Sequence, residues 1–272
     1  MKKAVNPLQV KQQQYKEAAA KGVPDMPFLY EEGSTLSMHF DMNSTQSVMR
    51  KHDPAYLVLG YTRTMMGFLF FQPEPERIAM IGLGGGSLAK YCAKHLPDTD
   101  FTAVEVNDKV IALRDKFKVP PDSDKFRVLH ANGADYVVNK SEQVDVLLID
   151  GFNEDGHPAS LCSAGFYDNC YAKLRNGGVM AVNLLARDLK YGTYTSRIRD
   201  SFENRVVVVV DAEENGNKVA FAYKGHDFPL AKDMLLDRIR TLGPKHPVPL
   251  HNTAQKIMQR TSSRPAAQTE MA

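Results

Sequence analysis

Residues 78–88 read IAMIGLGGGSL, an apolar run followed by four glycines within five positions. The apolar run Ile78–Ile81 predicts a short buried strand, and residues 87–95 predict a helix. A glycine-rich loop between a strand and a helix lets a ligand lie against bare backbone, near the positive end of the helix dipole. The loop therefore predicts a nucleotide or nucleoside site, although it does not separate a dinucleotide from an S-adenosyl compound. The predicted contacts in this loop are Gly82, Gly84, Gly85 and Gly86.

Strands and helices alternate regularly on the C-terminal side of this loop. The predicted strands are 101–106, 126–130, 144–149 and 179–183, and a hairpin of 206–211 with 219–223 closes the sheet. The predicted helices are 108–117, a short one from residue 134, 166–174 and 188–202. Apolar strands separated by helices indicate a parallel sheet that is covered on both faces. We therefore expect an α/β fold with a doubly wound, mostly parallel Rossmann-like sheet.

The regions that flank this sheet are expected to be smaller. Residues 1–24 form a polar lead-in that allows a short helix, and 28–49 alternate like a small antiparallel meander. Asp53 and Pro54 predict the start of a helix that runs to about residue 70. The expected division is 1–52 for the lead-in and β-hairpin region, 53–225 for the catalytic domain, and 226–272 for a C-terminal helix over 228–241 and a tail that is disordered from Thr261.

Composition restricts the class of protein further. The chain of 272 residues has 34 basic and 32 acidic residues mixed along its length, so no clustered basic face predicts nucleic-acid binding. No apolar run reaches the length of a membrane span, and the start lacks an apolar signal segment. The three cysteines form neither a disulfide framework nor a metal-binding spacing. We expect a cytoplasmic protein with no metal and no membrane partner.

Polar residues follow three of the predicted strands. Glu105 lies at the carboxyl end of the second strand, where a carboxylate can accept both ribose hydroxyls, and Val106 is the last residue of that strand. Asn132 and Gly133 end the third strand, where an adenine edge is usually bound. Asp150 follows the fourth strand, whose last four residues, 146–149, are all apolar. Because the carboxyl ends of parallel strands meet at one edge of the sheet, we expect these residues to line a single crevice.

Together these segments resemble the spermidine synthase family, the polyamine aminopropyltransferases, over about residues 28–225. The matching segments are Thr45-Gln46-Ser47, Tyr61, Gly82-Leu83-Gly84-Gly85-Gly86, Val104-Glu105-Val106-Asn107, Val144 to Asp150, Phe166-Tyr167 and Leu174 with Gly177-Gly178-Val179. The resemblance implies a sheet of the S-adenosylmethionine-dependent methyltransferase type and transfer of an aminopropyl group from decarboxylated S-adenosylmethionine to an amine. It also implies that Gln46 contacts the ribose side and that Glu105 holds the ribose hydroxyls.

The resemblance further implies the groups that act at the reacting centre. Asp150 would be the catalytic carboxylate that accepts a proton from the attacking amine, since a protonated amine is not a nucleophile. Tyr61 would pack against the ligand or hold the nucleophile. Asn132 and Gly133 would border the adenine.

Three acidic positions of the family pattern are absent from this sequence. Gly85 replaces an acidic residue that meets the amine tail of the donor, Asn153 replaces a second carboxylate after the fourth strand, and Asn132 replaces an acidic residue beside the adenine. Glu154 or Asp155 could supply one charge from the same loop. With Gly85 in place, and Arg63 or Lys90 near the site, a donor that keeps its carboxylate is also possible.

The leading hypothesis is therefore a spermidine synthase-like transferase with decarboxylated or intact S-adenosylmethionine as co-substrate. The alternatives are a methyl- or aminocarboxypropyl-transferase on the same scaffold and a catalytically silent homologue. An NAD-dependent oxidoreductase is disfavoured because no second domain supplies a catalytic His or Lys. We expect a homodimer, because the edge of the small hairpin region needs cover.

Overall fold

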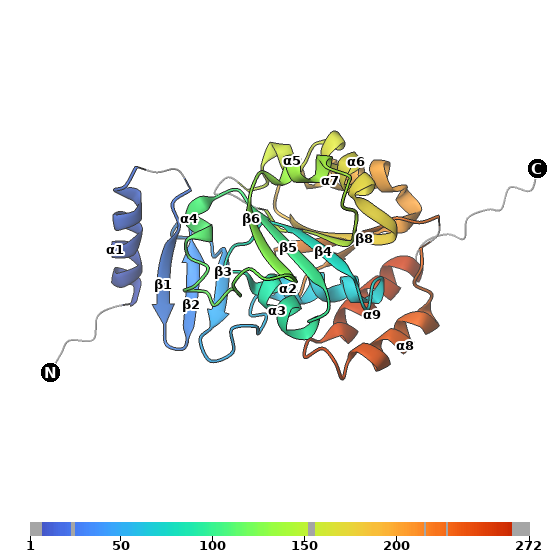
Figure 1. The fold of residues 1–272 in the computed structure, drawn as a ribbon, viewed down its shortest axis with the longest axis horizontal. Coiled ribbons are helices and arrows are strands. Elements are labelled where there is room, and N and C mark those ends of the chain that lie inside the picture. The colour runs from blue at the N-terminus through green and yellow to red at the C-terminus, as the bar shows by residue number, and fades with distance from the viewer. Residues whose placement is uncertain (1–6, 23–24, 152–155, 215, 227, 263–272) are drawn as a thin grey trace, which may run out of the picture.

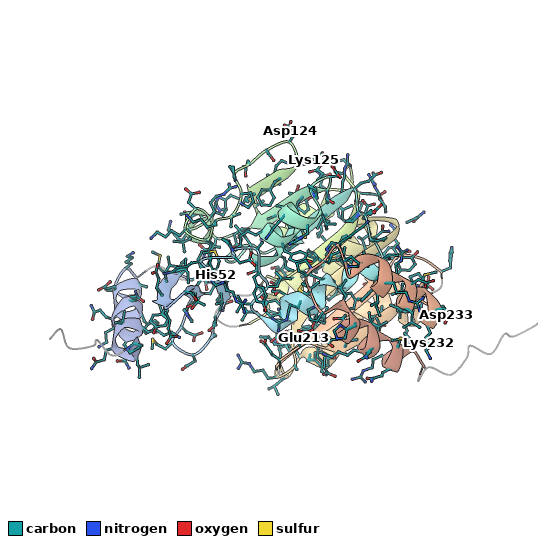
Figure 2. The ribbon with its side chains drawn as sticks, turned by 90° about the horizontal axis from the view of Figure 1, so that it is seen from below. His52, Asp124, Lys125, Glu213, Lys232 and Asp233 are labelled. Carbon is teal, nitrogen blue, oxygen red and sulfur yellow. The ribbon has the colours of Figure 1, made fainter. Side chains whose placement is uncertain are left out.

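The computed structural model describes residues 7–22, 25–151, 156–214, 216–226 and 228–262. These residues form a seven-stranded sheet, a three-stranded sheet and the helices that cover them (Figure 1). The three-stranded sheet and helix α1 (Pro7–Ala19) project from one side of the larger domain, as the two perpendicular views of Figures 1 and 2 show. The expected small N-terminal β region is therefore present, and its proposed boundary at residue 52 remains a prediction.

The large sheet contains the strands β4 (Arg77–Ile81), β5 (Asp100–Glu105), β6 (Phe126–His130), β7 (Val144–Ile149), β8 (Leu174–Leu185), β9 (Val207–Asp211) and β10 (Asn217–Tyr223). Their order is β6-β5-β4-β7-β8-β10-β9. Neighbouring strands from β6 to β8 are parallel, and β10 is antiparallel to both β8 and β9. This order confirms the predicted doubly wound, mostly parallel sheet.

Helices cover both faces of the large sheet (Figure 1). One face carries α5 (Gly133–Val138), α6 (Ala164–Lys173) and α7 (Tyr191–Phe202), and the other carries α2 (Gly60–Met65), η1 (Met66–Phe70), α3 (Ser87–His95), α8 (Lys232–Leu242) and α9 (Leu250–Ser262). Short elements complete the domain: α4 (Asp108–Ile111), η2 (Ala159–Leu161) and η3 (Asn204–Val206). Side chains of successive β7 residues point to opposite faces of the sheet. Leu147 packs in the apolar cluster on one face, and Leu148 packs in the cluster on the other. All six residues of β7 are buried, as in a strand with both faces covered, and the single polar one, Asp145, accepts from the amide of Arg77 at 2.8 Å.

The small sheet is a meander of β1 (Phe28–Glu32), β2 (Thr35–His39) and β3 (Ser47–Arg50), with β2 in the middle. Gly33 in the first turn has a φ of 54°, a backbone conformation that glycine adopts without strain. Met38 and Met49 are buried in the apolar cluster of the large domain. This packing holds one face of the small sheet close to the ends of the parallel strands.

The helix predicted from Asp53 to about residue 70 begins only at Gly60, so the predicted start was wrong. Asp53 does not cap a helix, because it forms an isolated bridge with Arg50 and an exposed ion pair with Lys94. The carbonyls of Leu57 and Val58 instead accept hydrogen bonds from the guanidinium of Arg63. A side chain therefore satisfies the backbone groups that a helix would have paired.

Two further expectations differ from the structure. The helix predicted over 108–117 is α-helical only to Ile111 and continues as turns. At the C-terminus, α8 matches the predicted helix, but α9 was not predicted, and Thr261 lies within it rather than in a tail. The amphipathic α9 buries Ala254 and Ile257 against the core. Residues 263–272 lie outside the described residues.

Candidate active site

The registers of three parallel strands bring the predicted site residues to one edge of the sheet. Ile81, the last residue of β4, pairs with Val104 of β5 on one side and Ile149 of β7 on the other. The next residues along each strand are therefore neighbours. The amide of Gly82 donates to the carbonyl of Val104 at 2.8 Å, and the amide of Asp150 donates to the carbonyl of Ile81 at 2.9 Å.

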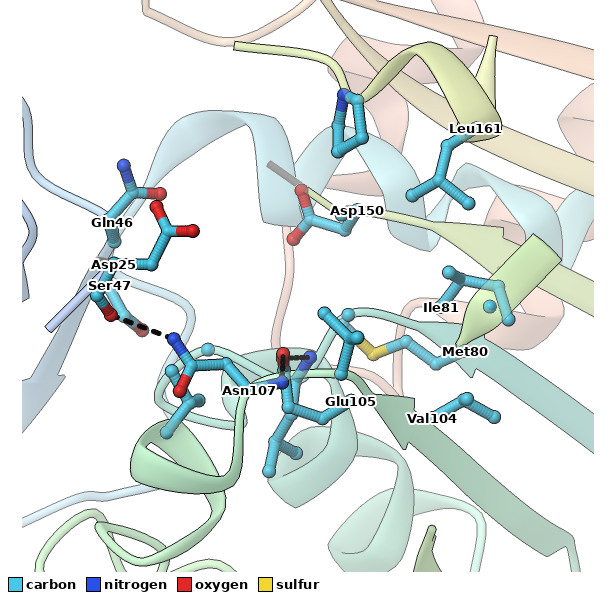
Figure 3. Close-up of a pocket in the computed structure, with 18 of the residues that line it drawn as sticks. Asp25, Gln46, Ser47, Met80, Ile81, Val104, Glu105, Asn107, Asp150 and Leu161 are labelled. Carbon is cyan, nitrogen blue, oxygen red and sulfur yellow. Dashed lines mark hydrogen bonds between the residues drawn. The ribbon is translucent and has the colours of Figure 1, made fainter. Parts of the chain in front are cut away.

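A cavity of about 300 Å³ lies at this edge (Figure 3). The predicted site residues that line it are Gln46, Tyr61, Gly82, Gly84, Glu105, Val106, Asn132, Gly133 and Asp150. Met38 and Ser47 of the small sheet, with Phe40 just after β2, close one side of the cavity. The structure therefore gathers into one cavity residues that lie more than a hundred positions apart in the sequence.

Gly85 and Gly86, which were predicted to touch the ligand, do not line the cavity. A Cβ atom at Gly85 would lie 2.5 Å from Ser47 Oγ and 2.7 Å from the ring of Phe117. A Cβ atom at Gly86 would lie 2.5 Å from Val119. Both glycines thus allow the loop to pack closely against its neighbours, and Gly82 and Gly84 present the loop to the cavity.

Glu105 is held by two backbone amides. Its Oε2 accepts from the amide of Leu83 at 2.8 Å, and its Oε1 accepts from the amide of Asn107 at 2.9 Å. The side chain is buried at the end of β5, so these bonds fix its orientation. Each oxygen of a carboxylate can accept more than one hydrogen bond. The arrangement therefore suits a ligand with two adjacent hydroxyl groups, such as a ribose.

Asp150 is held by two side chains from distant parts of the chain. Its Oδ2 accepts from the hydroxyl of Tyr61 at 3.1 Å, and its Oδ1 accepts from Nδ2 of Asn183 at 2.9 Å. The Oδ1 of Asn183 in turn accepts from Nδ2 of Asn217 at 2.7 Å. Burial raises the pKa of Asp150 to about 7, and the hydrogen bonds from Asn183 and Tyr61 oppose this rise. Asp150 can thus gain or lose a proton near neutral pH.

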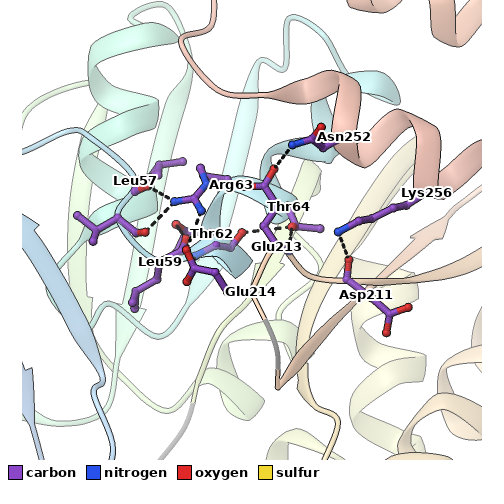
Figure 4. A network of polar contacts seen from close by, with 12 residues as sticks. Leu57, Leu59, Thr62, Arg63, Thr64, Asp211, Glu213, Glu214, Asn252 and Lys256 are labelled. Atoms are coloured by element: carbon purple, nitrogen blue, oxygen red, sulfur yellow. Dashed lines mark hydrogen bonds and ion pairs between the residues drawn. The ribbon is translucent and has the colours of Figure 1, made fainter.

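Tyr61 donates to Asp150 and stays protonated. Burial raises the pKa of Tyr61 well above its ordinary value, and the adjacent carboxylate raises it further. Tyr61 belongs to α2, and Arg63 of the same helix binds Glu213 at 2.6 Å and Glu214 at 2.9 Å (Figure 4). These glutamates follow β9, so the turn of the β9–β10 hairpin anchors α2.

The cavity is acidic. Among the residues that the structure describes, its charged lining side chains are Asp25, Glu105 and Asp150, and no Lys, Arg or His lines it. Lys90, considered as a cation near the ligand, is buried elsewhere and donates to the carbonyl of Phe117 at 2.8 Å. Arg63 is paired with Glu213 and Glu214, so neither of the two cations considered from the sequence lines the cavity.

On the side away from Asp25 and Gln46, the cavity is mostly apolar (Figure 3). Its walls include Ile81, Val104, Val106 and Leu161. Asn132 caps α5, because its Oδ1 accepts from the amide of Ala134 at 2.8 Å. A Cβ atom at Gly133 would lie 2.2 Å from Ile81 Cγ2, so only a residue without a side chain lets the backbone approach this wall. A flat aromatic base suits such a surface.

Asn183 and Asp25 are among the polar residues of this site that were not predicted. Asn183 ends the predicted strand 179–183, and its polar side chain after four apolar residues was an available signal. Asp25 lies in the polar segment before β1, where nothing in the local pattern distinguishes it. Asn153, Glu154 and Asp155 lie outside the described residues.

The fold and the cavity define a class, a Rossmann-like α/β protein of the S-adenosylmethionine-dependent methyltransferase type. A family model described as the spermine/spermidine synthase domain matches residues 58–189. A polyamine aminopropyltransferase of Neisseria meningitidis is 34% identical over 229 residues, 84% of this chain and 85% of that one. The chain belongs to the spermine/spermidine synthase family.

Other relatives and solved structures agree with this fold. A polyamine aminopropyltransferase of Chromobacterium violaceum is 36% identical over 207 residues, 76% of this chain and 78% of that one. The structure of spermidine synthase from Thermotoga maritima has a TM-score of 0.66 at 20% identity, covering 87% of this chain and 84% of that one. Human methyltransferase-like protein 13 in complex with SAH has a TM-score of 0.62 at 21% identity, covering 78% of this chain and 97% of that one.

Proposed function

We propose that the chain is a polyamine aminopropyltransferase that moves the aminopropyl group of decarboxylated S-adenosylmethionine to a small amine. One observation carries this choice of donor: three carboxylates line the cavity and no described basic side chain does. A sulfonium with an ammonium tail is attracted to such a cavity, whereas the carboxylate of intact S-adenosylmethionine would meet no cation there. The relatives named polyamine aminopropyltransferase support the same reaction.

The nucleoside half of the donor occupies the end of the cavity around Glu105. Glu105 accepts the two ribose hydroxyls, and Gln46 approaches the ribose from the small sheet. The backbone of Gly82 and Gly84 lies against the sugar and the chain that carries the sulfur. The adenine rests between the apolar walls, bordered by Val106, Asn132 and Gly133.

Asp150 acts as the base. As the acceptor nitrogen attacks the carbon next to the sulfonium, the C–N bond forms, the C–S bond breaks, and the sulfur keeps the bonding electron pair as a neutral thioether. The nitrogen loses its proton to Asp150. A pKa of about 7 lets this carboxylate accept the proton near neutral pH. Tyr61 and Asn183 hold the carboxylate toward the nucleophile, which supplies the positioning that such a displacement needs.

Turnover with each donor tests the reaction. The enzyme is incubated with a diamine such as putrescine and either decarboxylated or intact S-adenosylmethionine, and the transferred product is measured by mass spectrometry. We expect an aminopropylated amine and 5′-methylthioadenosine from the decarboxylated donor only. A preference for the intact donor would assign a methyl- or aminocarboxypropyl-transferase instead. Binding of the nucleosides without turnover would indicate a silent homologue.

Two further expectations belong to this proposal. The homodimer stays a prediction: among the described residues β1 pairs with β2 alone, and α1 packs along its other side (Figure 1). Sedimentation at micromolar concentration tests this, and a monomer contradicts it. A cytoplasmic location remains a prediction; among the described helices, none combines the length and apolarity needed to cross a bilayer.

A further inference from the structure

Asp25 reaches the cavity from the segment that precedes β1. Its φ of 51° is unusual for a residue with a side chain, and its carbonyl accepts from Nδ2 of Asn107 at 2.8 Å. This bond joins the N-terminal segment to the residues after β5. Figure 3 shows the carboxylate of Asp25 beside Gln46, pointing into the cavity and across it from Asp150. The backbone is therefore fixed in a way that aims an acidic group at the ligand.

The carboxylate of Asp25 is incompletely paired. Its Oδ1 is buried and has no hydrogen-bond partner among the described residues. No Lys, Arg or His of the described chain forms an ion pair with it within 4.0 Å. A buried carboxylate oxygen without a donor is costly, so a ligand that brings a donor to it gains the full benefit of that bond.

The glycine loop has no room for an acidic group of its own. A Cβ at Gly85 would already collide with Ser47 Oγ and the buried ring of Phe117. Ser47 follows Gln46 in the chain, and Asp25 lines the same side of the cavity in the view of Figure 3. The negative charge on this wall is thus supplied from the N-terminal segment rather than from the loop.

We propose that Asp25 binds a primary ammonium group of the substrates and so determines the preference of this enzyme for amine-bearing ligands. The inference rests on the proposed aminopropyl transfer. A primary ammonium offers three donors and a positive charge, which match the unpaired oxygen and the carboxylate. Two sources carry this group: the aminopropyl tail of the donor and the distal end of the diamine acceptor.

Calorimetry on Asp25→Asn separates this role from contact with the sugar. The two ligands are decarboxylated S-adenosylmethionine and 5′-methylthioadenosine, which keeps the nucleoside and lacks the ammonium. We expect the variant to bind the donor about 10- to 100-fold more weakly and 5′-methylthioadenosine within about threefold of the parent. If donor binding is unchanged and KM for the diamine rises about 10- to 100-fold instead, the bound ammonium belongs to the acceptor.

Glu32→Gln is the matched control, because Glu32 is an exposed acid at the end of β1, outside the cavity. Glu32→Gln also removes one negative charge, and it should change neither the two dissociation constants nor the KM for the diamine. Equal weakening of both nucleosides by Asp25→Asn overturns the proposal and assigns Asp25 to the sugar. The proposal is also overturned if Asp25→Asn changes neither the affinity for the two nucleosides nor the KM for the diamine. Absence of turnover in the parent refutes the proposed function, whereas the two binding constants still test Asp25.

Discussion

Replacing Tyr61 with Phe should move the acidic limb of the pH profile of kcat/KM to higher pH. The hydroxyl of Tyr61 donates to Asp150 and stabilises its ionised form. A hydrogen bond to a charged group contributes about 1.5–3 kcal/mol, and one pKa unit corresponds to about 1.4 kcal/mol. Removing the hydroxyl should therefore raise the pKa of Asp150 from about 7 by about one to two units.

The sign of the effect follows from which form of Asp150 is active. If the carboxylate is the base, kcat/KM rises with pH as Asp150 ionises, and the acidic limb of the profile reports its pKa in the free enzyme. A rise of one unit moves this limb to higher pH. At pH 7 the ionised fraction falls from about one half to about one tenth, so kcat/KM should fall about fivefold, and the loss should vanish at high pH.

The assay measures kcat/KM from pH 5.5 to 9.5 for the parent, Tyr61→Phe and the control Tyr56→Phe. Tyr56 precedes α2, lies under the guanidinium of Arg50 and does not line the cavity. The substrate amine titrates equally in all three enzymes, so differences between profiles report the protein. A loss that is the same at every pH, or an unshifted acidic limb, would refute the role of Tyr61 in setting the proton affinity of Asp150.

Three further predictions test the site and its support. Glu105→Gln should weaken the binding of 5′-methylthioadenosine about 10- to 100-fold, as measured by calorimetry. Both oxygens of Glu105 accept from backbone amides, and glutamine replaces one of these oxygens with a donor group. Asp150→Asn should raise Tm more at pH 8 than at pH 5. Because burial raises the pKa of Asp150 to about 7, ionisation of this carboxyl lowers the stability of the folded protein by at most about 4 kcal/mol as pH rises from about 4 to 7, and an amide does not ionise. An equal change in Tm at the two pH values contradicts this. Gly60→Ala should lower Tm and activity together, because its Cβ would lie 2.0 Å from the carbonyl oxygen of Glu213, whereas Gly165→Ala, with open space around it, should change neither adversely.

Local sequence patterns predicted the part of the fold that local interactions determine. The apolar run before Gly82 and the glycines after it predict a strand, a tight loop and a helix, all of which are present. Strand-end positions such as Glu105 and Asp150 could be assigned to one edge because parallel strands share their direction. Their registers in the structure bring them together as expected.

The failures involve partners that are far apart in the sequence. The start of α2 depends on Arg63 meeting Glu213, a residue 150 positions away, and no local cap signals it. Asp25 reaches the cavity because Asn107, 82 positions later, binds its carbonyl. The packing that excludes a side chain at Gly85 involves Phe117 and Ser47 from two other elements. Such contacts are set by tertiary structure, which periodicity and spacing do not contain.

The β9–β10 hairpin is connected to both partners of Asp150. Glu213, after β9, anchors the helix that carries Tyr61, and Asn217, at the start of β10, orients Asn183. None of these three supporting residues lines the cavity. A substitution in this hairpin can therefore change the proton affinity of Asp150 while every residue that lines the cavity stays the same. The residues that set the proton affinity of Asp150 therefore extend beyond those that face the cavity.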